Sequence, residues 1–140
     1  MECHADTINA LNTLLKYGYS GSPVERSDFK CHGIITAMVA DTDQLREKGL
    51  GDRLSLEKNS GMLFFFDQPA TYGFWMKDMN FPIDIIWVDG QKKVVGVAPA
   101  VPTSTYPSIF SPPSAISFVL EVNSGSAARF GIVTGIRLTW

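Results

Sequence analysis

Three features of the sequence predict a mostly β, single-domain fold of the β-sandwich or small-barrel type. The chain has 140 residues, which is enough for one compact core and too few for two stable ones. Its 45% hydrophobic and 19% charged residues are typical of a globular protein. About seven short strand-like segments, divided by turn signals and by two or three short helical segments, favour a sandwich or a small barrel.

The first 30 residues are expected to form an extension ahead of the main domain. Four apolar residues recur there at helical spacing: Ile8, Leu11, Leu14 and Leu15. This spacing predicts a short amphipathic helix over residues 6–17, ending at Gly18. Residues 19–30 are rich in turn-forming residues and are expected to be a linker. The main domain is therefore expected to cover residues 31–140.

The main domain shows alternating strand patterns and two helical segments. Strands are expected over residues 33–40, 62–66, 72–79, 83–88, 92–98, 116–122 and 136–140. Asp41-Thr-Asp-Gln44 can cap a short helix that runs to Lys48, with Gly49 at its C-terminal end. A second short helix is expected over residues 126–130, stopped by Gly131. Asp89-Gly90 lies between two apolar runs and indicates a hairpin.

An uncharged stretch from residue 94 to residue 120 contains a long predicted loop. The loop, residues 99–115, holds Pro99, Pro102, Pro107, Pro112 and Pro113, together with large apolar side chains. A solvated linker usually keeps fewer such groups, so we expect the loop to be ordered and to lie over the domain. Loops carry function more often than strands do, which makes Tyr106 a candidate ligand-binding residue.

Two carboxylates interrupt apolar strands and are the main candidates for a site. Asp84 shares a strand face with Ile86 and Val88, and Glu121 occupies another apolar strand. Burying an unpaired carboxylate costs several kcal/mol, so both residues need partners. Lys77 and Arg53 are the candidate cations.

Two explanations of these buried charges remain open. In the first, Asp84 and Glu121 belong to a structural network of ion pairs or accept hydrogen bonds from loop N–H groups. In the second, they line a polar pocket with Lys77 and Arg53, and that pocket binds a ligand. Trp75, next to the lysine in Phe-Trp-Met-Lys, would then supply an apolar platform.

Composition and motifs exclude several functional classes. A formal net charge of −2 leaves no basic surface of the kind that nucleic-acid binding requires. No apolar run approaches the ~20 residues of a membrane span, and the N-terminal residues do not resemble a signal peptide. The sequence contains no phosphate-binding glycine loop, no zinc-protease motif and no nucleophile elbow. We therefore expect no cofactor and find no catalytic signature.

The cysteines support more than one interpretation. Cys3-His4 and Cys31-His32 could in principle supply four zinc ligands, but their spacing matches no common zinc motif, so no metal is expected. A Cys3–Cys31 disulfide is favoured if the protein is exported. In a reducing compartment both would be free thiols.

A series of short motifs resembles a known family. In order, these motifs are Gly49-Leu50, Arg53, Gly61-Met-Leu-Phe64, Phe74-Trp-Met-Lys77, Phe81-Pro-Ile-Asp-Ile85, Ser111-Pro-Pro113, Val119-Leu-Glu121 and Asn123-Ser-Gly125. From about residue 34 to the C-terminus, the chain resembles the bacterial and archaeal family of domain of unknown function 192. The resemblance implies a compact sandwich or jelly-roll-like β domain, gives no activity, and favours an exported protein. Arg53, Trp75, Lys77, Asp84 and Glu121 all fall on its motif positions.

The sequence thus supports three functional hypotheses. The first is a module, monomeric or weakly oligomeric, that binds a small polar ligand such as a carbohydrate or a cell-envelope fragment. In it, Lys77 and Arg53 donate hydrogen bonds, Asp84 and Glu121 accept them, and Trp75 or Tyr106 packs against the ligand. The second is a hydrolase or lyase that uses Asp84 and Glu121 as an acid–base pair. The third is a structural or partner-binding module.

Overall fold

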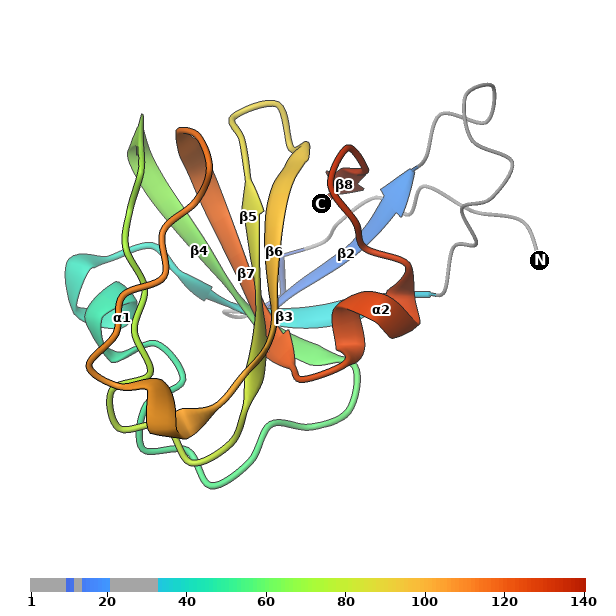
Figure 1. Cartoon of the computed structure of the whole chain (residues 1–140). Coiled ribbons are helices and arrows are strands. Elements are labelled where there is room, and N and C mark those ends of the chain that lie inside the picture. Colours follow the sequence, from blue (N-terminus) through green and yellow to red (C-terminus); the bar gives the residue numbers. More distant parts are fainter. Residues whose placement is uncertain (1–9, 12–13, 21–32) are drawn as a thin grey trace.

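The chain folds around one mixed β-sheet (Figure 1). The computed structural model describes residues 10–11, 14–20 and 33–140. In sheet order the strands are β1 (Ala10–Leu11), β2 (Leu14–Ser20), β3 (Ile35–Ala40), β4 (Ser60–Ala70), β7 (Ile116–Asn123), β5 (Ile83–Val88) and β6 (Val94–Val101), while β8 (Arg137–Thr139) pairs with β2. Only β3 and β4 are parallel among these pairs. The prediction of a mostly β single domain is confirmed, and the described strands do not close into a barrel.

The predicted N-terminal helix is wrong where the structure describes it. Residues 10–11 and 14–20 form strands, and β2 pairs antiparallel with both β3 and β8. A short apolar run fits a helix or a strand equally well, and here pairing with the free edge of β3 decides the outcome. The rest of the predicted helix and linker lies outside the described residues, as do Cys3, His4, Cys31 and His32. The proposed domain boundary at residue 31 stays a prediction.

The main domain follows the predicted strands with one exception. Strands occur in six of the seven expected places, and β5 has the predicted bounds. Residues 72–79 are not a strand, because only Phe74 pairs, in an isolated bridge with Phe110. Phe74 and Met76 are buried while Trp75 and Lys77 are exposed, so the segment alternates as a strand does. That alternation comes from packing onto the core and not from a ladder of strand pairs.

Both helices predicted within the main domain are confirmed, and so is the hairpin. In α1 (Asp43–Lys48), the Thr42 hydroxyl accepts a hydrogen bond from the Leu45 N–H, and Gly49 has a positive φ at the C-terminal end. α2 (Ser126–Phe130) lies between two glycines in the left-handed conformation. β5 and β6 form the expected antiparallel hairpin. In its turn, the Asp89 carboxylate accepts hydrogen bonds from two backbone N–H groups.

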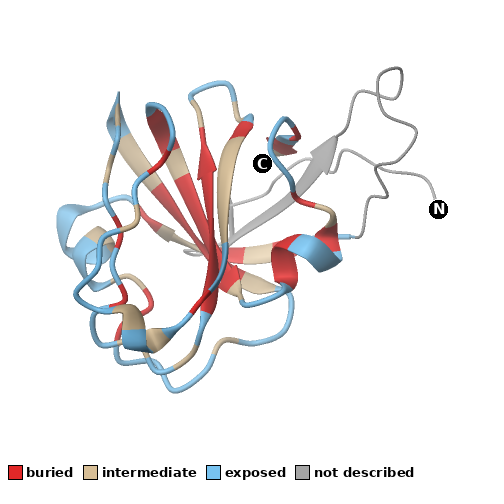
Figure 2. Cartoon of the chain, in the orientation of Figure 1, coloured by how far each residue is buried: buried red, intermediate tan, exposed pale blue. Residues whose placement is uncertain are grey.

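The central strands separate two hydrophobic cores. Consecutive residues of β4, β5 and β7 alternate between them, and Figure 2 shows buried residues concentrated along these strands. Leu63, Ile86 and Leu120 pack on the face that α2 covers, which we call the α2 face. Phe64 and Val119 belong to the core on the opposite face, which we call the pocket face.

Close packing of β4 against β7 predicts that Gly61→Ala destabilises the domain. A Cβ at position 61 would lie 2.6 Å from the Glu121 carbonyl oxygen and 3.0 Å from Val122 Cγ1. Because backbone has to shift, we expect a loss of roughly 1–3 kcal/mol in the free energy of unfolding, measured by urea denaturation. Gly90→Ala is the control, since its nearest new contact is the Ser117 hydroxyl at 3.3 Å. Equal losses in the two variants would contradict the prediction.

Candidate functional site

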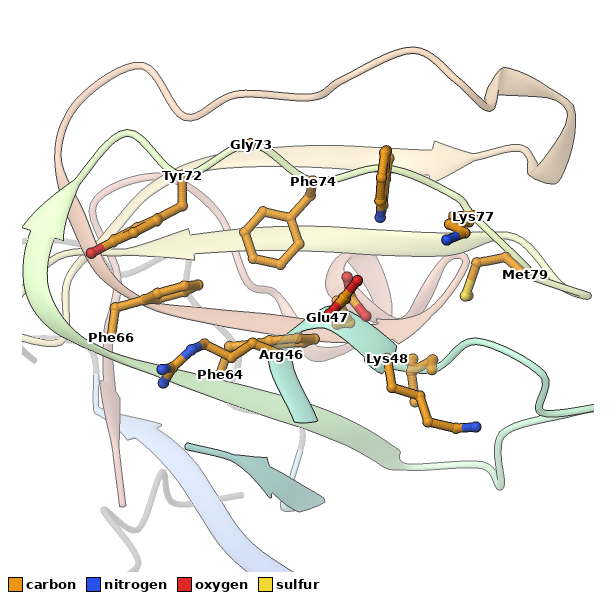
Figure 3. Close-up of a pocket in the computed structure, with 14 residues that line it drawn as sticks. Arg46, Glu47, Lys48, Phe64, Phe66, Tyr72, Gly73, Phe74, Lys77 and Met79 are labelled. Atoms are coloured by element: carbon orange, nitrogen blue, oxygen red, sulfur yellow. The ribbon is translucent and has the colours of Figure 1, made fainter. Parts of the chain in front are cut away.

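A pocket opens on the pocket face, between α1, β4, β7 and the segment that follows β4 (Figure 3). Its volume is about 290 Å³. Apolar and aromatic residues make up most of its wall, with five charged residues among them. The lining residues are Arg46, Glu47, Lys48, Gly49, Leu50, Phe64, Phe66, Tyr72, Gly73, Phe74, Trp75, Lys77, Met79 and Glu121.

Four packed rings form one side of the pocket. Phe66 stacks on Tyr72 with ring centroids 3.9 Å apart, and Phe74 meets the Phe64 ring edge-on at 5.3 Å. Figure 3 shows these rings gathered at one end, with Lys77 and Met79 at the other. Phe64 and Phe66 reach the pocket because alternate residues of β4 project from the same face. Neither Phe64 nor Phe66 is among the candidate site residues predicted from the sequence.

Glu121 is the buried polar group of the pocket. Glu121 is only 5% exposed, and in the sheet it lies opposite Met62 on β4 and Ile85 on β5. Within the described residues, its carboxyl group has no hydrogen-bond or ion-pair partner. Burial disfavours the charged form and raises the pKa of Glu121 to about 8. In the empty pocket, Glu121 therefore keeps its proton at neutral pH.

Two of the cations in the wall are engaged away from Glu121. Arg46 donates hydrogen bonds to the Phe65 carbonyl oxygen at 2.6 Å and to the Asp43 carboxylate at 2.7 Å. Lys48 lies 3.5 Å from the Asp52 carboxylate, and Figure 3 shows its side chain directed away from the rings. Neither of these residues, nor Lys77, forms an ion pair with Glu121.

The structure brings four of the six predicted site residues together. Trp75, Lys77 and Glu121 line the pocket, and the Lys77 ammonium lies 5.6 Å from the Trp75 ring centroid. Tyr106 meets the Trp75 ring at 5.8 Å, outside the lining itself. Its loop is held there by two backbone hydrogen bonds between Phe74 and Phe110. The long loop thus lies over the domain, as predicted, and its contacts are with the segment that lines the pocket.

Asp84 lies on the other face of the sheet. It pairs with Val122, whereas Glu121 pairs with Ile85, so the two carboxylates project from opposite faces. Asp84 accepts hydrogen bonds from three backbone N–H groups, those of Ala100, Gly125 and Ala127. The hypothesis of an acid–base pair is therefore corrected: Asp84 and Glu121 share no cleft.

Arg53 also lies away from the pocket. Its side chain is exposed, and its Nη2 donates a hydrogen bond to the Met38 sulfur at 3.0 Å. Its carbonyl oxygen accepts a hydrogen bond from the Asn80 amide at 2.8 Å. Arg53 therefore does not meet Glu121 or Lys77 in a common site.

A second, polar hollow adjoins the pocket. Its volume is about 220 Å³, and it is lined by Gln44, Glu47, Lys48, Gly51, Asp52, Lys77 and Asp78. Glu47, Lys48 and Lys77 line both spaces, so the two hollows meet along these three side chains. A ligand longer than the pocket could extend into the polar hollow.

In the described part of the chain, no three His, Cys, Asp or Glu side chains gather closely enough to hold a metal ion. No helix there has the length and apolar character needed to cross a membrane.

Comparisons with known proteins identify relatives of unassigned function. The model of the DUF192 family, described as "Uncharacterized ACR, COG1430", matches residues 25–140. A protein from Sinorhizobium meliloti 1021, for which a role as a transcription regulator has been suggested, has a crystal structure with a TM-score of 0.78. It is 25% identical, over 89% of this chain and 92% of that one. The crystal structure of a protein of unknown function from Novosphingobium aromaticivorans DSM 12444 has a TM-score of 0.77. That protein is 26% identical, and the match covers 97% of this chain and 94% of that one. No curated protein is significantly similar in sequence.

Proposed function

We propose that this chain, which belongs to the DUF192 family, is a module that binds a small polar ligand of the carbohydrate or cell-envelope class. One observation carries the proposal: Glu121 is buried at an aromatic-lined pocket and has no partner among the described residues. Its carboxyl oxygens are not among the fully enclosed polar atoms that lack a hydrogen bond, so they face the space of the pocket. A ligand in the pocket can therefore reach this buried carboxyl group and form a hydrogen bond with it.

The wall chemistry supports a ligand with one apolar face and several polar groups. Aromatic rings pack against apolar surfaces, and Trp75 is 43% exposed and accessible from solvent. Lys77 can donate hydrogen bonds at the opening, and Glu121 can donate or accept one inside. A sugar ring offers both features, since its C–H groups form apolar patches and its hydroxyl groups surround them.

Pocket size supports a ligand, or a ligand fragment, of one ring. Its volume of about 290 Å³ lies at the lower end of the range typical of small-molecule sites. Arg53 and Asp84 are not part of the proposal, because neither lines the pocket. The proposed ligand-binding residues are thus Trp75, Lys77 and Glu121, with Tyr106 beside them.

Thermal unfolding in the presence of mono- and disaccharides and peptidoglycan fragments tests the proposal. A ligand at 100 times its Kd adds about 2.7 kcal/mol to the stability, which raises Tm by several degrees in a domain of this size. We expect Trp75→Ala and Lys77→Ala to weaken binding about tenfold each, a loss of about 1.4 kcal/mol. Both side chains are exposed, so both variants should fold.

Arg53→Ala is the matched control for the lysine variant. It removes an exposed cation that lies outside the pocket, and it should leave the affinity unchanged. The proposal is contradicted if no compound in the panel raises Tm. It is also contradicted if Arg53→Ala weakens binding as much as Lys77→Ala does.

A further inference from the structure

The environment of Glu121 restricts the kind of group that can bind beside it. β4 and β5 place apolar residues, Met62 and Ile85, opposite it. α1 contributes Arg46, Glu47 and Lys48 to the pocket, and the segment after β4 contributes Lys77. The three cations, Arg46, Lys48 and Lys77, form no ion pair with Glu121. Arg46 binds the Phe65 carbonyl oxygen and Asp43, and Lys48 pairs with Asp52. The protein thus leaves its buried carboxyl group available to a group from outside.

The aromatic wall favours a cation in that place. The faces of Phe, Tyr and Trp rings carry negative charge density and attract ammonium and guanidinium groups. This chain already uses that attraction, because the Arg46 guanidinium lies 5.4 Å from the centre of the Phe66 ring and the Lys77 ammonium is similarly close to Trp75. A cationic ligand can use the same attraction in this pocket.

We propose, resting on the ligand-binding function above, that the group bound against Glu121 is a protonated amine and that the ligand is an amino sugar. The ammonium would donate hydrogen bonds to the Glu121 carboxylate. The sugar ring would pack against Phe74 and Trp75. Its hydroxyl groups would reach the charged side chains that line both hollows, Glu47, Lys48 and Lys77.

Binding of such a ligand is coupled to release of a proton. In the empty pocket the carboxyl group is protonated at pH 7, because burial raises the pKa of Glu121 to about 8. An adjacent ammonium favours the carboxylate, so the Glu121 proton leaves to solvent as the ion pair forms. The amine keeps its own proton. One ammonium is therefore bound and close to one proton is released per ligand.

Calorimetric titration of the full chain at pH 7 tests the inference with glucosamine, glucose and N-acetylglucosamine. These three sugars differ at a single ring substituent, which is an ammonium, a hydroxyl and a neutral amide. We expect glucosamine to bind at least tenfold more tightly than the other two. Repeating the titration in buffers of different ionisation enthalpy gives the number of protons released, and we expect close to one for glucosamine.

Variants separate Glu121 from the other charged residues. Glu121→Gln keeps the size of the side chain and should abolish both the preference for glucosamine and the proton release. Lys77→Ala should weaken binding but keep the proton release, because Lys77 does not form the ion pair. The proton count on the unaltered protein tests the inference even if Glu121→Gln fails to fold.

Each outcome has a distinct meaning. Equal binding of glucose or N-acetylglucosamine, without proton release, overturns the amine inference and leaves the ligand-binding function standing. Ethanolamine binding as tightly as glucosamine overturns the sugar assignment. Binding of none of these compounds overturns the inference, and failure of the whole carbohydrate and envelope panel overturns the proposed function as well.

Discussion

Glu121→Gln is expected to become progressively more stable than the natural protein as pH rises from about 4.5 to about 8. Burial raises the pKa of Glu121 from 4.5 to about 8, so the folded state holds a proton that the unfolded state has released throughout this interval. The contribution that this difference in pKa makes to the stability of the folded state is fully present below pH 4.5. It falls as pH rises and is lost above pH 8. At about 1.4 kcal/mol per pKa unit, the natural protein loses roughly 5 kcal/mol across the interval.

Urea denaturation of both proteins at intervals from pH 5 to pH 9 measures this effect. The difference between their free energies of unfolding should grow by about 1.4 kcal/mol per pH unit and become constant above pH 8. Glu57→Gln is the control, since it makes the same change at an exposed position and so separates the effect of burial from the loss of a carboxylate. If the difference for Glu121→Gln stayed constant with pH, the pKa of the Glu121 carboxyl group would not be raised in the folded protein.

The elements predicted correctly are those whose signals are local. The strand over residues 83–88 is an apolar run that ends at the Asp89-Gly90 turn, and the helix over residues 126–130 is flanked by glycines. Both signals can be seen directly in the sequence. The two errors depend on contacts distant in sequence. Residues 14–20 are a strand because β3 and β8 lie beside them. Residues 72–79 alternate because they cover a core, without pairing along their length.

The candidate site was only partly predictable for the same reason. A charged residue on an apolar strand pointed to Glu121 and Asp84 equally. What separates them is the register between β5 and β7, which sets Glu121 opposite Ile85 and so sends the two carboxylates to opposite faces. Register depends on the whole sheet and cannot be read from either strand. Alternation alone places Phe64 and Phe66 on one face of the sheet. It does not show which of the two faces opens into a pocket.

Asp84 holds three segments of the α2 face together. Its carboxylate accepts hydrogen bonds from the N–H groups of Ala100 at 2.7 Å, Gly125 at 3.2 Å and Ala127 at 2.9 Å. Ala100 lies in β6 with a φ of 50°, which is a strained conformation for a residue with a side chain. Gly125 and Ala127 lie at the start of α2, which has five residues and is too short to be stable without tertiary contacts. Asp84 therefore fixes both the end of β6 and the position of the helix.

Asp84→Ala is expected to lower the free energy of unfolding by roughly 3–5 kcal/mol, because it leaves three backbone donors without their acceptor. Urea denaturation measures the loss. Asp89→Ala is the matched control: its carboxylate also accepts two backbone N–H bonds, but in an exposed turn, where we expect about 1 kcal/mol.

Asp84→Asn keeps one acceptor oxygen and should leave enough folded protein for titration. Because Asp84 faces away from the pocket, any ligand of the Glu121 pocket should bind this variant as it binds the natural protein. A selective loss of binding in a folded Asp84→Asn protein would contradict the assignment of Asp84 to structure. A loss of stability with unchanged affinity would separate the two buried carboxylates by role, with Asp84 stabilising the fold and Glu121 binding the ligand.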